Sequence, residues 1–403
     1  MRALICGAGI AGLTLAWHLE RAGWDVELAE RAPGFRDGGY MIDFYGPGYE
    51  AVRLMGLEDA LLAVRHPVDS LEYLDRTGRR TSGVTMPPGL SEVVSVLRGD
   101  LARVLRDAVS APTLYGTSIA EISQDAGRVG VLLTGGDTRE VDLLVGADGA
   151  HSRVRELAWG PQERYLRYLD HHVAAYLLTD EALSARLGHG YRMLTVPGLM
   201  AGAYALPGGR VAMLFLRHEP DPVLPESPGE ALAAAFGGLG WILPGVLERR
   251  PADHEIYYDQ VTQVEMDGWS RGRVTLLGDS CQAVSLFAGH GASMAMTAAW
   301  TLADALGGGA GGGAGGGTGV EAALAAYEAR MRPRIGEVQK FGRRFVRWMA
   351  PPSRSRILAR DWLLRLASLP GAGRLFLNSL TPGGHSLVPE GAAPVPGGPV
   401  KRP

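Results

Sequence analysis

Cysteine is scarce in this chain. Only two of the 403 residues are cysteines, Cys6 and Cys281, and they lie far apart in the sequence. So few cysteines exclude a scaffold held together by disulfides, and the usage is typical of a protein in a reducing, intracellular compartment. We therefore expect a cytoplasmic protein.

Excess positive charge and long apolar runs are also missing. The net charge is −3 and the sequence pI is about 6.4, which does not indicate a nucleic-acid-binding protein. No run of 18 apolar residues occurs, so we predict no transmembrane segment. Met1 lies one residue before the first predicted strand, so we also expect no signal peptide.

Metal-ligand clusters are absent from the pattern as well. His171 and His172 are neighbours, and neighbouring side chains on a strand point to opposite faces, so they cannot chelate one metal together. With no other clustered spacing of ligands, we predict no metal site.

Glycine, by contrast, is abundant. The chain has 57 glycines in 403 residues, which is about twice the usual share of ~7%. Part of the excess lies in residues 307–319, which we predict to be a flexible segment. Residues 381–403 are rich in Pro and Gly, and we predict a disordered tail there.

The first thirty residues contain the clearest motif. Residues 2–6 predict a short buried strand, Gly7-Ala8-Gly9-Ile10-Ala11-Gly12 follows directly, and apolar residues then recur at helical spacing as far as Arg21. A second strand covers 25–29 and ends at Glu30. This order of strand, glycine turn, helix, strand and acid is the dinucleotide-binding fingerprint.

Each glycine of that fingerprint, and the acid that ends it, has a physical role. Gly7 makes the tight turn, Gly9 lets the backbone approach a pyrophosphate, and Gly12 lets the helix pack close to its strand. The start of the helix presents free N–H groups and a partial positive charge to the phosphates. Glu30 can accept hydrogen bonds from a ribose 2′-OH.

The rest of the chain alternates between the two kinds of secondary structure. The pattern predicts a helix pair over 48–65 and further helices over 320–349 and 353–368. It predicts strands within 69–97, 113–122, 128–134, 139–146 and 273–277. The β-rich region 165–262 predicts an antiparallel sheet inserted into the nucleotide domain. The fold class is therefore α/β.

The last two predicted helices are strongly basic. Seven arginines lie in this region, namely Arg343, Arg344, Arg347, Arg354, Arg356, Arg360 and Arg365. They could contact an acidic surface or a membrane, or they could form a solvated face while Phe341, Phe345 and Trp348 pack inward. The pattern favours the second interpretation.

Three motifs occur in a fixed order. They are GAGIAG with Glu30, then VGADGAHSRVRE from Val145, then RVTLLGDSCQAVSLFAGHGASMAM from Arg273. Over residues 1–306 the chain thereby resembles the class A flavoprotein aromatic hydroxylases, with the fold of para-hydroxybenzoate hydroxylase. The members it resembles most are those acting on aromatic polyketides and tetracyclines. The resemblance implies a Rossmann-like FAD-binding domain of GR2 type, an inserted mostly antiparallel β-sheet substrate domain, and C-terminal helices.

The resemblance also implies a domain organisation. The FAD-binding domain would comprise residues 1–68, 98–164 and 265–306, and the substrate domain 69–97 and 165–264. The glycine-rich segment 307–319, a helical region 320–380 and the tail 381–403 would follow.

The same resemblance implies a set of cofactor-binding residues. Tight, non-covalent FAD would be held by Gly7, Gly9, Ala11, Gly12, Glu30, Arg31, Gly39, Arg98, Asp148, Asp279, Gly291 and Ala292. Gly289, His290 and Gly291 would lie near the flavin ring. Because the flavin carries the chemistry, we expect no protein side chain to act as a general base.

The third motif departs from the pattern of many members. They carry Asp-Ala-Ala-His after the glycine and a proline four residues beyond that histidine. Here Asp279 is followed by Ser280, Cys281 and Gln282, and Leu286 takes the place of the proline.

The implied reaction is an NAD(P)H- and O2-dependent monooxygenation. NADPH or NADH, as a transient co-substrate, would reduce FAD, and the reduced flavin would react with oxygen to give a C4a-hydroperoxyflavin. This species would hydroxylate an aromatic or polycyclic, polyketide-like molecule. The reaction would belong to secondary metabolism, such as antibiotic biosynthesis. The protein would be a monomer or a dimer. Open alternatives are another flavin redox enzyme (epoxidase, Baeyer–Villiger-type oxygenase or prenyl-chain reductase) and a non-catalytic FAD-binding partner protein.

Overall fold

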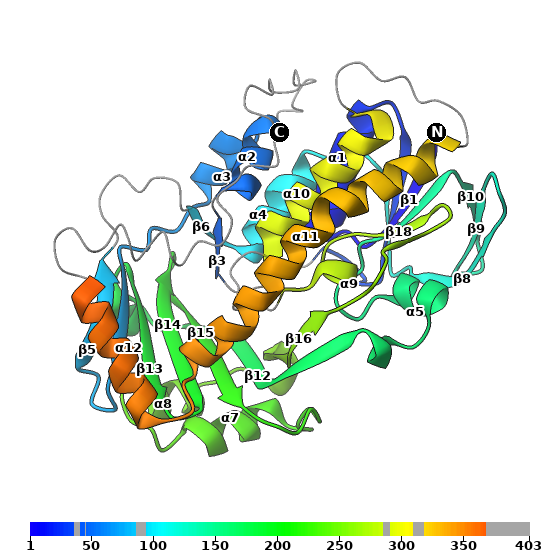
Figure 1. The fold of residues 1–403 in the computed structure, drawn as a ribbon. Coiled ribbons are helices and arrows are strands. Elements are labelled where there is room, and N and C mark those ends of the chain that lie inside the picture. Colours follow the sequence, from blue (N-terminus) through cyan, green and yellow to red (C-terminus); the bar gives the residue numbers. More distant parts are fainter. Residues whose placement is uncertain (36–40, 45, 86–93, 285–290, 309–317, 368–403) are drawn as a thin grey trace.

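The computed structural model contains two large sheets that are bridged by one long helix (Figure 1). It describes residues 1–35, 41–44, 46–85, 94–284, 291–308 and 318–367. The residues predicted as the glycine-rich segment and as the tail lie almost entirely outside these ranges.

The first sheet has six strands and is built around the N-terminal strand. In spatial order its members are β17 (Ser270–Arg271), β18 (Val274–Leu276), β11 (Leu143–Gly146), β1 (Arg2–Cys6), β2 (Asp25–Glu30) and β7 (Thr113–Tyr115). All neighbours pair in parallel except β17 with β18. The inner strands are apolar along almost their whole length because both faces of such a sheet are covered.

Helices and two small sheets cover this core. The helices are α1 (Ile10–Arg21), α2 (Pro47–Leu54), α3 (Glu58–Ala63), α4 (Arg98–Asp107), α5 (Arg153–Trp159), α9 (Asp279–Gln282) and α10 (Gly291–Ala303). The small sheets are β8 (Ile119–Gln124), β9 (Val129–Leu133) and β10 (Thr138–Val141), and β3 (Met41–Phe44) with β6 (Val94–Leu97). Helix α1 packs against α4 and α10.

The second sheet has seven strands. In spatial order they are β16 (Tyr257–Val264), β12 (Leu166–Thr179), β15 (Arg210–His218), β14 (Leu199–Leu206), β13 (Gly190–Val196), β4 (Ser70–Leu74) and β5 (Arg80–Thr85). Only β13 and β4 pair in parallel. The prediction of an inserted, mostly antiparallel sheet is therefore confirmed.

Side chains alternate between the two faces of this sheet. Ala174 and its partner Phe215 belong to a core shared with α6 (Glu181–Leu187), α7 (Pro228–Phe236) and α8 (Leu243–Glu248). Their neighbours Val173 and Leu216 join a second core on the opposite face. Both faces are thus buried.

Helix α11 (Thr318–Met349) connects the two sheets, and α12 (Arg354–Ala367) follows it (Figure 1). Tyr327 is buried in the core of the six-stranded sheet, whereas Val346 and Met349 are buried against the seven-stranded sheet. The expectation that Phe341, Phe345 and Trp348 pack inward holds only in part, because all three are half-buried.

Two short strands were not predicted, namely β3 and β17. Strand β3 pairs with β6, which comes from the end of the 69–97 region. Strand β6 therefore contacts β3 rather than the seven-stranded sheet. The fold class is as predicted, and the domain boundaries stay a prediction.

Two further properties apply to the described ranges alone. None of their helices is long and apolar enough to cross a membrane. Nor do they contain a group of three or more His, Cys, Asp and Glu side chains placed to hold a metal ion.

Candidate functional site

The carboxyl ends of four parallel strands bring the predicted motifs together. Strands β2, β1, β11 and β18 are consecutive neighbours, so their ends meet at one edge of the sheet. Gly7 follows β1, Glu30 ends β2, Asp148 follows β11 and Asp279 follows β18. This edge is where open α/β sheets bind ligands.

The glycine turn after β1 is tight. Gly7 has φ +110°, and a Cβ there would lie 2.3 Å from the carbonyl oxygen of Ala147. A Cβ on Gly12 would lie 2.0 Å from the carbonyl oxygen of Gly7, so a side chain would push α1 away from its strand. A Cβ on Gly9 would meet nothing within 4 Å. The space in front of Gly9 is therefore open to a ligand.

The start of α1 can hold an anion. Gly9 is its N-cap residue, no side chain caps the helix, and its first turn carries no acidic residue. The first N–H groups and the positive end of the helix dipole thus face the open space in front of Gly9.

Glu30 is held in place by the backbone around it. Its Oε2 accepts a hydrogen bond from the Ala8 N–H at 3.0 Å, and its Oε1 accepts one from the Ala32 N–H at 2.8 Å. A carboxylate has four lone-pair positions, so both oxygens can still accept hydrogen bonds from hydroxyl groups.

Two adjoining cavities lie at this edge. The first, here called the strand-end cavity, is lined by predicted residues Gly7, Gly9, Glu30, Arg31, Arg98 and Asp148. The second, the inter-sheet cavity, is lined by predicted residues Gly9, Ala11, Arg98, Asp279, Gly291 and Ala292. Because Gly9 and Arg98 line both, the two cavities form one elongated site.

The opposite wall of the inter-sheet cavity belongs to the seven-stranded sheet. Val173 of β12 and Tyr257, Asp259, Gln260, Val261 and Thr262 of β16 line it. The site thus lies between the two sheets. Gly12 contributes through packing alone, and Gly39, Gly289 and His290 lie outside the described residues.

Asp279 faces into the inter-sheet cavity from the start of α9. Its side chain is open to the cavity, but the surrounding protein removes bulk water and raises the pKa of the carboxyl, while the positive charge of Arg98 opposes that rise. No described residue donates a hydrogen bond to this carboxylate. A ligand hydroxyl would supply the missing donor.

Asp148, in contrast, is engaged by protein groups. Its Oδ1 accepts a hydrogen bond from Ser152 Oγ at 2.5 Å, and its Oδ2 accepts from the Arg153 N–H at 2.7 Å and the Val154 N–H at 3.1 Å. Ser152 also caps α5, because its side chain accepts a hydrogen bond from the Arg155 N–H. The carboxylate fixes this turn, and its predicted part in nucleotide binding stays a prediction.

Arg155 lies behind the site and was not singled out in the sequence; it lines neither cavity. Its guanidinium is completely buried and donates to the carbonyl oxygens of Ser280 at 2.8 Å and Ala150 at 2.7 Å. Burial lowers its pKa, and the charge of Asp148 opposes that shift. The arginine thereby ties together the turns after β11 and β18.

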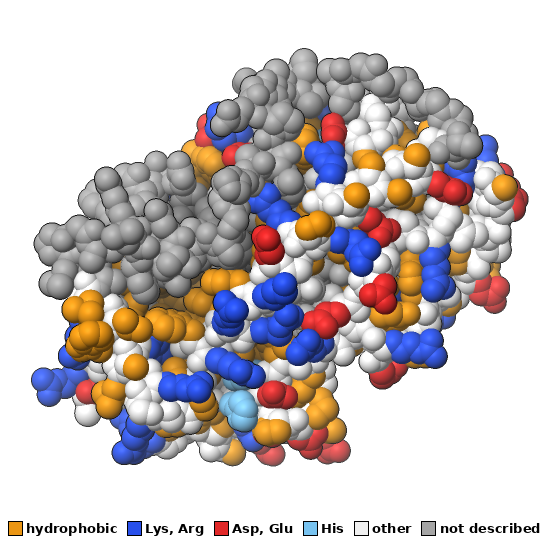
Figure 2. All heavy atoms as spheres, viewed as in Figure 1, with side chains coloured by type: hydrophobic (Ala, Val, Ile, Leu, Met, Phe, Trp, Pro, Cys, Tyr) orange, Lys and Arg blue, Asp and Glu red, His pale blue; other side chains and the backbone are white. Residues whose placement is uncertain are grey.

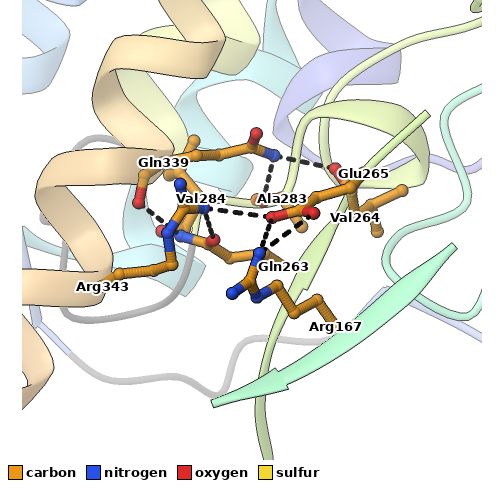
Figure 3. Close-up of polar contacts among 8 residues, drawn as sticks. All are labelled: Arg167, Gln263, Val264, Glu265, Ala283, Val284, Gln339 and Arg343. Carbon is orange, nitrogen blue, oxygen red and sulfur yellow. Dashed lines mark hydrogen bonds and ion pairs between the residues drawn. The ribbon is translucent and has the colours of Figure 1, made fainter. Parts of the chain in front are cut away.

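A second set of residues that the sequence did not single out lies behind the cavity wall (Figure 3). Gln263 Nε2 donates to the Val284 carbonyl at 3.0 Å and to the Gln339 carbonyl at 2.9 Å. Gln339 Nε2 donates to the carbonyls of Val264 at 2.7 Å and Ala283 at 3.1 Å. Both glutamines are buried. Since Ala283 and Val284 line the inter-sheet cavity, these amides hold its wall against α11.

An ionic cluster closes the outer side of that arrangement (Figure 3). Arg343 Nη1 donates to Gln263 Oε1 at 2.8 Å and to Glu265 Oε1 at 3.0 Å, and Arg167 Nη1 donates to Glu265 at 3.2 Å. One arginine of the basic helix α11 therefore orients the buried amide of Gln263. Isolated glutamines carry no motif, so only the fold reveals them.

The described residues of the third motif that differ from the family pattern have side chains that point away from the cavity. Ser280 Oγ donates to the Gly146 carbonyl at 2.6 Å, and Gln282 Nε2 donates to Tyr327 Oη of α11 at 2.5 Å. Cys281 is buried, and none of these three lies among the described lining residues of the inter-sheet cavity. These substitutions thus leave the described cavity wall unchanged, while Leu286 lies outside the described residues.

Comparison with known proteins agrees with this geometry. Residues 2–55 match the family model of FAD dependent oxidoreductases. An uncharacterized protein of Mycobacterium tuberculosis, MT1298, is 32% identical over 311 residues, which cover 74% of this chain and 83% of that protein. The flavin-dependent monooxygenase eupH of a Phoma species is 30% identical over 332 residues, covering 75% of this chain and 76% of that protein.

A solved structure extends the likeness over nearly the whole fold. The crystal structure of tetracycline destructase Tet(55) superposes with a TM-score of 0.76 and 25% identity, covering 92% of this chain and 96% of that one. Together with the relatives and the strand-end site, this establishes that the chain belongs to the class A FAD-dependent monooxygenases, a family of FAD-dependent oxidoreductases.

Proposed function

We propose that this protein uses NAD(P)H and O2 to hydroxylate an aromatic or polycyclic small molecule with tightly but non-covalently bound FAD. The observation that carries this proposal is the inter-sheet cavity, where the strand ends of the six-stranded sheet face strands of the seven-stranded sheet. A ring placed there would lie between the helix start at Gly291 and strand β16.

The residues present fit FAD. The open space at Gly9 and the free start of α1 would take the pyrophosphate, Glu30 would bind the adenosine ribose, and Asp279 would accept a hydrogen bond from the ribityl chain. Arg98 lines both cavities and would place its charge near the phosphates. Bound FAD supplies electron transfer from NAD(P)H and the activation of oxygen for transfer to the substrate.

Helix α10 would tune the charge at the ring. It is 13 residues long, and Gly291 and Ala292 at its start line the inter-sheet cavity. The positive end of its dipole would stabilise negative charge on a reduced ring beside it.

The seven-stranded sheet would form the substrate side of the cavity. Val173 and Val261 are buried there, and Gln260 and Thr262 add polar groups. Such a wall excludes water while it orients a substrate, which limits the wasteful release of peroxide. A polycyclic substrate is supported by the likeness to a tetracycline destructase, since tetracycline is a four-ring molecule.

The test combines a spectrum with turnover. The purified protein should show flavin absorption, and NADPH or NADH oxidation should rise when polycyclic phenols are added. With ¹⁸O2, mass spectrometry should find one labelled oxygen in the product. Labelled product with an epoxide or a ring-expanded ester would identify one of the other oxygenases, and an unlabelled reduced product would identify a reductase.

Two matched variants connect that activity to the cavity. Asp279→Asn removes the carboxylate that faces the inter-sheet cavity, whereas Asp142→Asn changes a carboxylate directly before β11 that contacts Arg128 at 3.2 Å and lines neither cavity. Asp142 also accepts a hydrogen bond from the Arg2 N–H at 2.7 Å, so both variants change a carboxylate that has a role in the protein. The first should lower FAD content and turnover of the folded protein, and the second should not. Bound flavin that neither NADPH nor NADH reduces, with any substrate tested, would refute the proposed function.

A further inference from the structure

Helix α12 presents its apolar side outward. Leu358, Trp362 and Leu366 follow one another at intervals of four residues, and Leu363 lies beside them. The exposed fractions of these side chains are 69%, 61%, 39% and 44%, respectively. A group of large apolar side chains exposed side by side marks an interaction site more often than it forms an ordinary solvated surface.

The inward side of the same helix carries charge. Arg360 and Asp361 are buried there as an ion pair with an Nη2–Oδ1 distance of 3.1 Å, and the Arg360 guanidinium lies 3.7 Å from the centre of the Tyr73 ring. Leu364 completes the contact with the seven-stranded sheet. The polarity of α12 is thus inverted relative to a helix whose outer side faces only water.

Positive charge surrounds the apolar side chains. Residues 340–366 contain eight Lys and Arg and one acidic residue, Asp361, although the whole chain has a net charge of −3. A groove between α11 and α12 is lined by Lys340, Arg344, Arg347 and Arg356 and extends to Leu363. Figure 2 shows the hydrophobic side chains over α12 and the band of basic side chains over the C-terminal half of α11 on one face of the molecule.

We propose that this face, defined by Leu358, Trp362, Leu363 and Leu366 with Arg344, Arg347, Arg354 and Arg356, docks the protein on an anionic membrane surface. The leucines and the tryptophan would enter the boundary between headgroups and acyl chains, and the arginines would contact lipid phosphates. No ion pair among the described residues engages these four arginine side chains, so their charge is available to the lipid.

Charge decides between the possible occupants of this face. A second copy of the chain joined about a two-fold axis would bring the four arginines of this face against the same four, which repel one another. An acidic protein would satisfy the arginines but would leave the exposed Trp and Leu side chains without a matching apolar layer. An anionic lipid interface satisfies both groups at once, since Trp and Arg are favoured there.

The experiment measures partition of the full-length protein onto vesicles. We expect flotation with vesicles of phosphatidylcholine and phosphatidylglycerol, little flotation with phosphatidylcholine alone, and release of the protein by high salt. The triple variant Arg344→Gln, Arg347→Gln, Arg356→Gln should lower the partition coefficient by about five-fold for each charge removed. The double variant Leu358→Asn, Trp362→Asn should lower it by at least ten-fold.

Matched variants separate this face from general surface properties. Arg128→Gln, Arg186→Gln, Arg249→Gln removes three exposed arginines elsewhere, and Val223→Asn, Leu224→Asn removes two exposed apolar residues elsewhere. Neither should change partition, and no variant should change the absorption spectrum of the holoprotein. Equal flotation of all variants, flotation independent of phosphatidylglycerol, or no flotation at all would overturn the proposal. A dimer that Trp362→Asn dissociates would assign the face to a second copy.

Discussion

Replacing Gln339 by Leu removes the amide that joins α11 to the cavity wall. The two side chains have similar volume, so the substitution creates little empty space. It deletes the donor to the Val264 carbonyl at 2.7 Å and to the Ala283 carbonyl at 3.1 Å. The Gln263 amide keeps its bond to the Gln339 main chain, because that acceptor is a backbone oxygen.

The expected loss of stability follows from the acceptors left behind. A buried acceptor that loses its donor costs about 1–3 kcal/mol. The Ala283 carbonyl still accepts from the Val264 N–H at 3.3 Å, so its share should be at the low end of that range. We expect Gln339→Leu to lower the free energy of unfolding by roughly 2–4 kcal/mol.

The assay has two readouts. Urea unfolding of the FAD-free protein gives the stability change, and titration of FAD gives the affinity change. Because Ala283 and Val284 line the inter-sheet cavity, we expect the Kd for FAD to rise by about ten-fold, which corresponds to ~1.4 kcal/mol. Lys340→Met is the control, since Lys340 is the exposed neighbour of Gln339 and is not part of the network.

The outcome can contradict the argument in two ways. If Gln339→Leu and Lys340→Met unfold at the same urea concentration, the amide does not hold the wall. If Gln339→Leu loses stability but binds FAD with the affinity of the unaltered protein, the wall position does not depend on it.

Three more predictions follow from the structure. Gly9→Ala should leave the midpoint of thermal unfolding unchanged and weaken FAD binding, because a Cβ at Gly9 meets open space. Gly12→Val should destabilise the protein by about 3 kcal/mol or more, because a Cβ there meets a carbonyl oxygen at 2.0 Å. Similar thermal midpoints for the two variants would contradict this prediction. The protein around the cavity removes bulk water from Asp279 and raises the pKa of its carboxyl, so stability falls as pH rises from about 4 through that raised value. Asp279→Asn should therefore stabilise the FAD-free protein at pH 8, with a difference that vanishes near pH 4 in urea titrations. Burial lowers the pKa of His18 to about 3, so the contribution of the neutral imidazole to stability is complete above pH 6.5 and is lost as pH falls toward 3. His18→Leu should therefore reduce the pH dependence of the unfolding free energy between pH 6.5 and 3 by up to ~1.4 kcal/mol per pH unit.

Local patterns predicted much of the fold. The helix that ends at Arg21 and the helix pair within 48–65 coincide with α1 and with α2 and α3, and the helices over 320–349 and 353–368 coincide with α11 and α12. Short-range spacing of apolar residues is sufficient for such elements, because the face that each buries is determined by its own residues. Strand β3 was missed because it has four residues and its partner β6 lies more than forty positions away.

The sequence by itself determined the geometry of the glycine turn, the helix start and Glu30, because all three lie within one continuous segment whose geometry is local. Only the tertiary structure decided the rest of the site. Arg155, Gln263 and Gln339 reach carbonyl groups that are distant in sequence, and a hydrogen bond between distant segments leaves no pattern in either of them. The same holds for α12, where the contact with the seven-stranded sheet determines which side of the helix is buried and leaves Trp362 exposed.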